Sequence, residues 1–261
     1  MKRRVLSCAL AAALFSATAS SAQEFSEPAP AAQLTVAALL ERGLPASDGA
    51  LGAIALATRW HGLAEIETRS LAIAFGARSV RFAAGASQTG EAELGWTQAS
   101  IGAGVASECY GFALRGCVRR RAVVNGEGTG GEVGAGAWVE ASPSVVVWAT
   151  APQLWTRGDP PPLSRWLEIG ARLERAEAHL WLARSAAPGA PSGLRAEHLA
   201  GLLVPVGLAA IWIEGRDHPA RGTLGISVMA GTLRVSAAVE GHPVLGETVR
   251  LALGIGERSW W

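Results

Sequence analysis

The chain has 261 residues, of which 23 are Lys or Arg and 22 are Asp or Glu, so its formal net charge is +1. This balance argues against a polybasic nucleic-acid-binding protein. The 3 Cys include no CxxC pair, and no metal-ligand spacing is present, so a structural zinc site is excluded as well. We expect neither a metal nor another cofactor.

The first 22 residues predict a cleaved secretory signal peptide. Met1–Arg4 is basic, Val5–Thr18 is apolar, and Ser20–Ala22 supplies the small residues that a signal peptidase recognises. Cleavage after Ala22 would leave 239 of the 261 residues and change the net charge from +1 to −2, because the removed segment contains three basic residues and no acidic one. The protein is therefore expected outside the cytoplasm, and its mature length allows one all-β domain.

Residues 23–69 predict an N-terminal linker followed by helices. Glu24–Ala32 is rich in Pro, Ala and Ser and is typical of a flexible terminus. Leu34–Arg42 has helical spacing, and Gly43 follows as a C-cap. Ser47 and Asp48 are expected to open a second short helix through Gly52–Arg59.

From residue 70 to residue 261 the apolar residues recur with a period of two, which predicts β-strands with one aliphatic and one mixed face. The strongest alternation covers Glu132–Glu140, Trp166–Glu174, Thr232–Glu240 and Thr248–Gly256. Weaker copies cover Leu71–Phe75, Val80–Ala86, Thr97–Val105, Tyr110–Val118, Val145–Ala149, Ala178–Leu182, Ala209–Ile213 and Thr223–Val228. Turn-rich connections between them favour antiparallel hairpins in series.

Two all-β architectures fit this alternation. A soluble β-sandwich or barrel buries its aliphatic face, whereas a transmembrane barrel turns that face to lipid and its polar residues to the lumen. Strands of about nine residues favour the membrane, since that length crosses the hydrocarbon layer when tilted. Several Trp on the mixed face favour a soluble protein, because membrane barrels usually place aromatic residues outward. Phe75, Phe82, Tyr110 and Phe112 are the main aromatic residues on the aliphatic face.

We favour an antiparallel up-and-down transmembrane β-barrel of about 10–14 strands over residues 70–261, with the helical segment plugging or approaching its lumen. Small residues on the mixed face are expected to make room for Trp and for paired charges. The expected lumen-lining residues are Arg115, Arg119, Trp138, Glu140, Glu168, Arg172, His179, Trp181, Trp212, Glu214, Arg234, Glu240 and Arg250.

The chain resembles bacterial outer-membrane β-barrel proteins in its signal peptide, short helical segment, alternating strands and final hairpin Ala238–Thr248. The resemblance is to the broad group that includes the long-chain fatty-acid transporter and PorV-like secretion components. The Asn-Pro-Ala-Gly motif of that group is absent, and Arg59–Leu63 occupies the region. Trp261 supplies a terminal aromatic residue, although Glu257–Ser259 interrupts the alternation before it. The resemblance implies an outer-membrane location.

Reactive side chains give little sign of an enzyme. Cys109 and Cys117 are eight residues apart, about 26 Å along one straight strand, so we expect free thiols or an intermolecular bond. A lipid hydrolase would need Ser236, His179 and Glu168 to converge, without a G-x-S-x-G signature. Arg119–Arg121 predicts a solvated strand end or a rim that contacts lipopolysaccharide.

The sequence therefore favours a non-enzymatic outer-membrane barrel that acts as a passive pore, a conduit for hydrophobic compounds, or an assembly or secretion partner. Its expected partners are outer-membrane lipid and either a small hydrophobic ligand or another envelope protein. Two alternatives stay open: a periplasmic or secreted β-protein that binds a ligand through its Trp-bearing face, and an outer-membrane lipid hydrolase.

Overall fold

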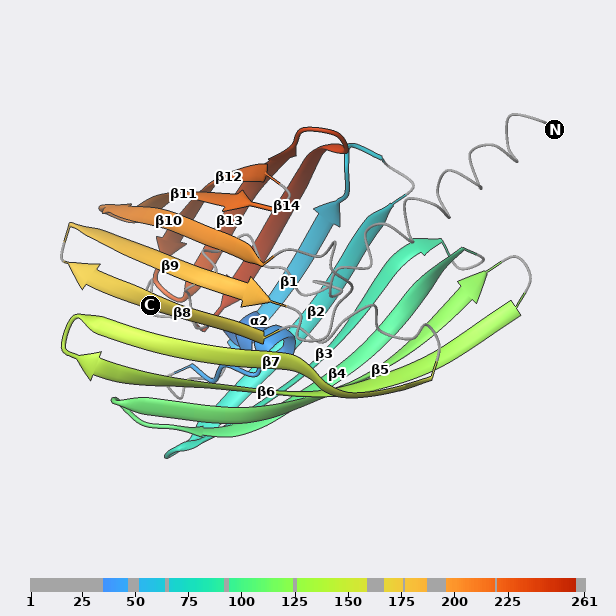
Figure 1. The fold of residues 1–261 in the computed structure, drawn as a ribbon, viewed down its shortest axis with the longest axis horizontal. Coiled ribbons are helices and arrows are strands. Elements are labelled where there is room, and N and C mark those ends of the chain that lie inside the picture. The colour runs from blue at the N-terminus through green and yellow to red at the C-terminus, as the bar shows by residue number, and fades with distance from the viewer. Residues whose placement is uncertain are drawn as a thin grey trace.

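The protein forms one closed antiparallel β-barrel of 14 strands (Figure 1). The computed structural model describes residues 35–46, 52–63, 66–91, 94–123, 126–158, 167–175, 177–186, 196–218 and 220–256. The elements are α2 (Val36–Arg42), β1 (Gly52–Arg59), β2 (Glu67–Ala77), β3 (Val80–Glu91), β4 (Leu94–Ala106), β5 (Tyr110–Val123), β6 (Gly126–Ser142), β7 (Val145–Gly158), β8 (Leu167–Arg175), β9 (Ala178–Ala186), β10 (Glu197–Val206), β11 (Ala209–Asp217), β12 (Ala220–Ala230), β13 (Leu233–His242) and β14 (Gly246–Ile255).

The strand order is that of an up-and-down barrel. Each strand pairs with its neighbours in sequence, and β1 closes the barrel against β14, with Ala53 opposite Ile255 and Arg59 opposite Val249. Closure leaves no free sheet edge. The predicted fold class and the upper limit of the predicted strand number are confirmed.

The two ends of the barrel differ in the length of their connections. At the end where β1 begins and β14 finishes, successive strands are joined by two or three residues, as at 78–79, 143–144 and 207–208. At the opposite end the connections are more variable, and the one between β9 and β10 has ten residues, 187–196. We call these the short-turn end and the long-connection end.

The expected helix over Gly52–Arg59 is wrong, because this segment is strand β1 and the barrel begins there instead of at residue 70. Alternating Ala residues gave the segment a high helix propensity. Pairing with β14 on one side and β2 on the other overrides that propensity. β1 turns its aliphatic Ile54 and Leu56 inward, where they are buried, as β10 does with Leu199 and Leu203.

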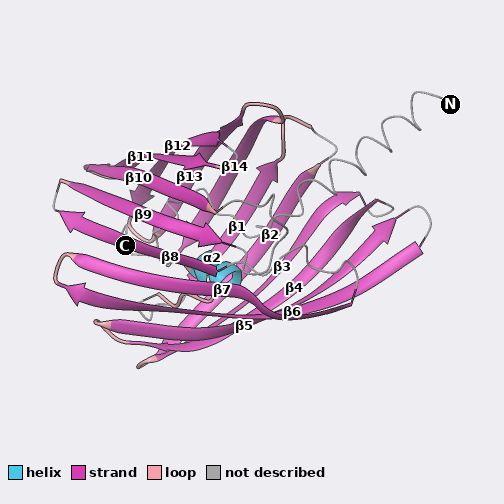
Figure 2. Ribbon diagram, in the orientation of Figure 1, coloured by secondary structure: helices cyan, strands magenta, loops and turns pink. Residues whose placement is uncertain are grey.

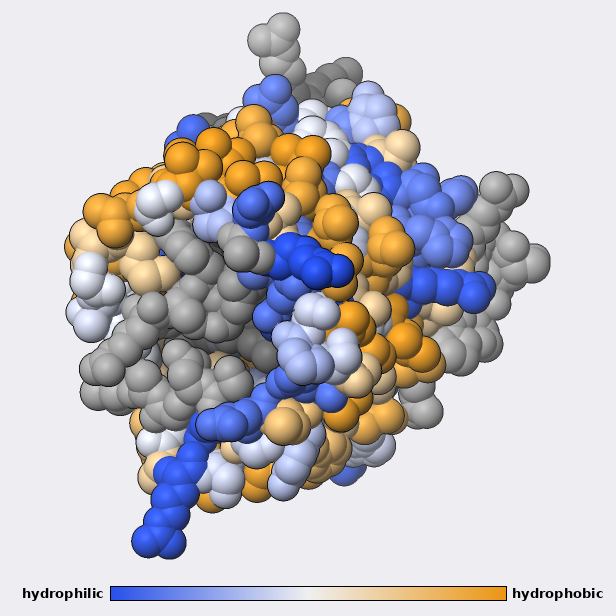
Figure 3. Space-filling view, turned by 90° about the vertical axis from the view of Figure 1, so that its left-hand side faces the viewer, coloured by the Kyte–Doolittle hydropathy of each residue, from blue (hydrophilic) through white to orange (hydrophobic). Residues whose placement is uncertain are grey.

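The aliphatic face of the strands is the outer face of the barrel. Apolar side chains at its mid-height are half or more exposed: Leu71, Ile73, Ile101, Leu114, Val118, Ile169, Leu182, Ile213, Leu224, Val235 and Leu251. Seen from the short-turn end, hydrophobic residues occupy much of the visible periphery (Figure 3). Outward charged residues such as Arg59, Arg69 and Arg120 lie near strand ends.

The expected helix over Leu34–Arg42 is confirmed as α2, which lies inside the barrel (Figures 1 and 2). The Thr35 side chain accepts a hydrogen bond from the Ala38 amide at 3.2 Å and caps the first turn. Gly43 ends the helix in the left-handed region, at φ 71°. A hydrophobic cluster joins Leu39 and Leu40 to residues of the surrounding wall, among them Ile54 and Leu56 of β1.

Candidate functional site

The candidate site is the barrel interior, and its largest feature is a chain of ion pairs on β10–β14. Arg216 joins Glu214 at 3.1 Å to Glu197 at 3.5 Å, and Arg221 joins Glu197 at 2.6 Å to Glu240 at 3.9 Å. Arg250 completes the chain with Glu240 at 2.9 Å. We call these six residues the inner ion-pair chain. Because each guanidinium has a carboxylate beside it, the chain places six charges in the interior without a net charge.

A Trp residue lies at each end of the inner ion-pair chain. The indole of Trp181 donates to Glu214 at 3.2 Å. At the other end, the Arg250 guanidinium carbon lies 5.9 Å from the centre of the Trp60 ring, within the range of a cation–π contact. Trp60 belongs to the connection between β1 and β2, and it donates to Thr68 at 2.8 Å.

The neighbouring His61 also lies at the long-connection end. Its backbone amide donates to the Thr248 hydroxyl at 3.3 Å, which links the β1–β2 connection to β14. Burial, together with the nearby His242, lowers the pKa of His61. The neutral imidazole is therefore favoured at this position.

A second polar group surrounds Glu168 on β8. Its carboxylate accepts a hydrogen bond from the Trp148 indole at 2.9 Å and one from the Ser185 hydroxyl at 3.2 Å. The Arg42 guanidinium of α2 lies 3.4 Å from the same carboxylate. Glu168 thus connects the helix inside the barrel to β7, β8 and β9.

A third polar group lies on β5–β7, where Arg115 pairs with Glu132. The Gln153 amide donates to the other oxygen of Glu132 at 3.1 Å. Arg115 also donates to the backbone carbonyl of Glu41 in α2. Like Glu168, this group joins the wall to the helix.

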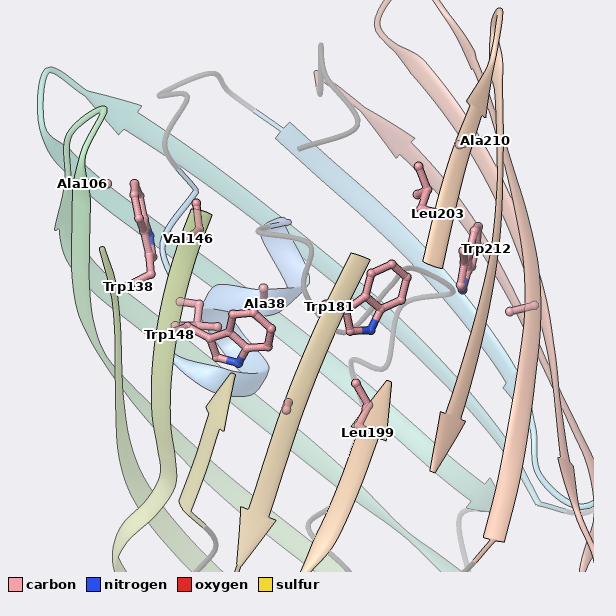
Figure 4. Close-up of a cluster of buried hydrophobic side chains, with 13 residues drawn as sticks. Ala38, Ala106, Trp138, Val146, Trp148, Trp181, Leu199, Leu203, Ala210 and Trp212 are labelled. Atoms are coloured by element: carbon pink, nitrogen blue, oxygen red, sulfur yellow. The ribbon is translucent and has the colours of Figure 1, made fainter. Parts of the chain in front are cut away.

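Four Trp of the mixed face, Trp138, Trp148, Trp181 and Trp212, point into the interior, and each is at most 4% exposed (Figure 4). Each lies directly across from a Gly on the adjacent strand: Trp138 from Gly111, Trp148 from Gly170, Trp181 from Gly201 and Trp212 from Gly225. A Cβ atom at any of these glycines would lie 2.0–2.3 Å from the indole. The indoles therefore cover the glycines, as the sequence predicted when it assigned small residues to make room for Trp.

All thirteen expected lumen-lining residues lie on the inner face of the barrel wall. Glu214, Glu240 and Arg250 meet in the inner ion-pair chain, and Trp181 touches its end. Arg172 pairs with Glu174, and Arg119 donates to Gln98 at 2.9 Å. Trp138 and Glu168 contact the α2 segment instead.

Several interior charges were not among the expected lumen-lining residues: Glu41, Arg42, Glu132, Glu174, Glu197, Arg216 and Arg221. Most of these charged residues lie at the same inward-facing positions of the alternation as the expected lumen-lining residues, so the same pattern would have identified them. Glu197 begins β10, which lay in an apolar run with too little alternation to be predicted as a strand.

The three residues of the lipid-hydrolase alternative are engaged separately. The Ser236 hydroxyl on β13 bonds to the Ser227 hydroxyl at 2.6 Å. Glu168 is held by Trp148 and Ser185, and His179 lies on β9 beside Leu180 and Trp181. The hydrogen bonds of Ser236 and Glu168 in the described part of the chain therefore join neither residue to the other.

Both described cysteines are free thiols within this chain. Cys109 is exposed in the short turn between β4 and β5, and Cys117 is buried on β5. Within the described ranges, no three His, Cys, Asp or Glu side chains gather in a way that could hold a metal ion. The same ranges contain no helix long and apolar enough to cross a membrane.

No family model matches the chain, and no curated protein matches it. Among solved structures, the chain is similar to variants of the Rhodopseudomonas blastica porin. One has 10% identity and a TM-score of 0.46, and a triple mutant has 11% and 0.44; each comparison covers 80% of this chain and 99% of the porin. The resemblance to fatty-acid transporters and PorV-like proteins stays a prediction.

Proposed function

We propose that the protein is an outer-membrane β-barrel that works as a passive, non-enzymatic channel for small polar or charged solutes. The observation that carries the proposal is the orientation of the two faces, with aliphatic side chains outside and the inner ion-pair chain inside. In water this arrangement would leave a very large apolar surface exposed, which soluble monomers avoid. In a bilayer the same surface is solvated by acyl chains.

The ends of the barrel support an orientation in the membrane. Bacterial outer-membrane barrels have short periplasmic turns and longer extracellular loops, so the short-turn end is assigned to the periplasm. Phe75 and Phe82, whose rings stack at 5.2 Å between centroids, lie on the outer face next to this end, as do Tyr110 and Phe112. This places four aromatic residues at the expected level of one membrane interface.

The interior supports a polar cargo. Most of its charges belong to Arg–Glu pairs, and the indoles of Trp148 and Trp181 donate to carboxylates while that of Trp138 donates to a backbone carbonyl. An apolar compound passing these groups would remove water from them without replacing its hydrogen bonds. Ions and small hydrophilic solutes meet no such penalty, so they are the favoured cargo over a hydrophobic compound.

Two measurements test this function. The native protein should sediment with outer membranes and migrate faster on a gel when it is not boiled. After reconstitution into planar bilayers, it should produce discrete, ohmic current steps in potassium chloride. A protein that stays in the soluble fraction would contradict the location. A membrane-inserted, heat-modifiable protein that gives no current would contradict the channel.

A further inference from the structure

Apolar side chains surround α2 inside the barrel (Figure 4). One hydrophobic cluster joins Leu39 and Leu40 of the helix to side chains of β1, β2, β3, β5 and β14. A second cluster joins Ala38 and Leu44 to side chains of β4, β6, β7, β9, β10, β11 and β13. We call the two clusters together the apolar belt. It takes in α2 and every strand except β8 and β12.

At these two strands the belt is continued by indoles. A Cβ atom at Gly170 of β8 would lie 2.1 Å from the Trp148 ring, and one at Gly225 of β12 would lie 2.0 Å from the Trp212 ring. The indoles therefore cover the inner face of both strands at this level. No residue that makes up the two clusters is more than 8% exposed, so the wall and the helix are packed against each other with little access for solvent.

The apolar belt lies nearer the short-turn end than the charged groups of the same strands. On β5, Arg115 is two residues closer to the long-connection end than Ala113, and on β14 Arg250 is two residues closer than Ala252. An ion that moves from this charged region into the belt loses its water without gaining polar contacts. An apolar constriction of this kind excludes ions and water.

The one part of the belt that lies outside the sheet of the described structure is α2. No backbone hydrogen bond joins the helix to a strand within the described residues. It is attached through side chains, which are the Arg42–Glu168 pair at 3.4 Å and three donors to carbonyls at the end of the helix or just beyond it. The donors are Arg81, Arg115 and Trp138. The helix can therefore leave the belt without opening the barrel wall.

The attachment after the helix indicates the direction in which it would leave. The Trp138 indole donates to the Pro45 carbonyl at 2.8 Å, and Arg81, the second residue of β3, donates to the Ala46 carbonyl at 3.0 Å. Strand β1 then begins at Gly52, also at the short-turn end. The chain that follows α2 is thus held at this end, and the route to it avoids the charged region of the interior.

We propose that α2 is the gate of the channel: in its present position it completes the apolar belt and closes the barrel, and the barrel conducts when the helix leaves through the short-turn end. This inference rests on the proposed channel function. It concerns the opening of the barrel and makes the current steps of the wild type the periods in which α2 is displaced.

A disulfide that holds α2 in place tests the gate. Leu39→Cys and Gly102→Cys would be combined with Cys109→Ser and Cys117→Ser, because a Cβ atom at residue 102 lies 2.9 Å from the Leu39 side chain. In planar bilayers the reduced protein should give current steps, the oxidised protein should give none, and added reductant should restore them. Equal current in both forms would overturn the gate and leave the channel function standing.

The matched control is a disulfide within the wall. Ser227→Cys and Ser236→Cys, in the same Cys109→Ser and Cys117→Ser background, lie opposite each other on β12 and β13. This bond does not include α2, so the oxidised and reduced forms should conduct alike. Heat modifiability verifies that each barrel is folded. Loss of current on oxidation of the control as well would contradict the assignment of closure to the helix.

Labelling of Leu40→Cys, again without the two native cysteines, tests the direction of exit. Leu40 is fully buried in the closed structure. A maleimide attached to a polyethylene glycol too large for the channel should not react when it is added to intact cells. It should react once the outer membrane is permeabilised and the reagent reaches the periplasm. Reaction in intact cells would overturn exit through the short-turn end.

A variant that disrupts the helix separates the gate from the channel itself. Leu40→Pro places a proline inside α2, which costs about 3 kcal/mol of helix stability, and should increase the fraction of time that the barrel conducts. An open fraction equal to that of the wild type would contradict the gate. A folded, inserted protein without current in the wild type and in every variant would overturn the channel function and, with it, the gate.

Discussion

The four pairs of Trp and Gly show how single residues fill the barrel interior. Each indole lies against a glycine on the adjacent strand, and the N–H groups of Trp138, Trp148 and Trp181 reach acceptors, as Trp181 does with Glu214 at 3.2 Å. A buried indole is stable where its N–H is bonded and its ring has close contacts on both sides. The glycine is the residue type that leaves space for this contact.

Gly201→Ala should therefore destabilise the barrel. The new methyl group would lie 2.1 Å from the Trp181 ring and force it away from Glu214. Overpacking of this kind costs about 1–3 kcal/mol. Urea unfolding in lipid vesicles, monitored by Trp fluorescence, measures the decrease in the free energy of unfolding. Gly215→Ala is the matched control, because a Cβ atom there meets no atom within 4 Å; equal losses in both variants would contradict the packing argument.

The sequence predicted which Trp face inward but not which Gly lies across from each one. Parity along a strand follows from local alternation, so Trp138, Trp148, Trp181 and Trp212 shared the mixed face with the charges. The partner across the strand depends on register, which is a property of two segments together. For the same reason, the order of pairs in the inner ion-pair chain could not be read from the sequence.

At the scale of elements, α2 makes the barrel interior a packed core on one side. Its Leu residues meet Ile54 and Leu56 of β1, which explains why that strand turns these two aliphatic residues inward. The helix was predictable from its spacing and its terminal Gly43, both of which are local signals. Strand β1 could not be predicted from local signals, because the residues on its inward face are specified by the helix that it packs against.

Loss of the N-cap should weaken α2 within the intact barrel. Thr35→Ala removes the hydroxyl that accepts the Ala38 amide and should cost about 1 kcal/mol. The midpoint temperature at which the unboiled, fast-migrating form disappears should fall. Thr35→Ser keeps the hydroxyl and should behave like the wild type. A midpoint unchanged in the Ala variant would mean that the cap makes no contribution.

For the whole molecule, the outer surface distinguishes a membrane barrel from a soluble one. Leu182 is 68% exposed at the centre of β9, so an Arg at this position has ample space in either case. In water Leu182→Arg would be nearly neutral, whereas at the middle of a bilayer it should cost about 2–4 kcal/mol. Urea titration of each protein folded into vesicles with a bilayer of defined thickness gives the difference in free energy of unfolding between the variant and the wild type.

The control for this experiment is Val244→Arg, at a residue that is 84% exposed in the connection between β13 and β14. It lies beyond the strands, where a charged side chain reaches water, and should change the free energy of unfolding by less than about 1 kcal/mol. Two equally small effects would contradict the assignment of the aliphatic face to lipid.

The seam between β1 and β14 has a consequence for assembly in the cell. The barrel cannot close until the last strand has been synthesised, because Ala53 pairs with Ile255 across the seam. Helix α2 ends at Arg42, close in sequence to the start of β1 at Gly52, so it is tethered to the same end of the barrel as the seam strands. The helix must be enclosed while β1 and β14 pair, or enter afterwards from the short-turn end. The cellular machinery that folds the barrel would then act on a chain whose helix α2 is attached directly before β1, one of the two strands that close the barrel.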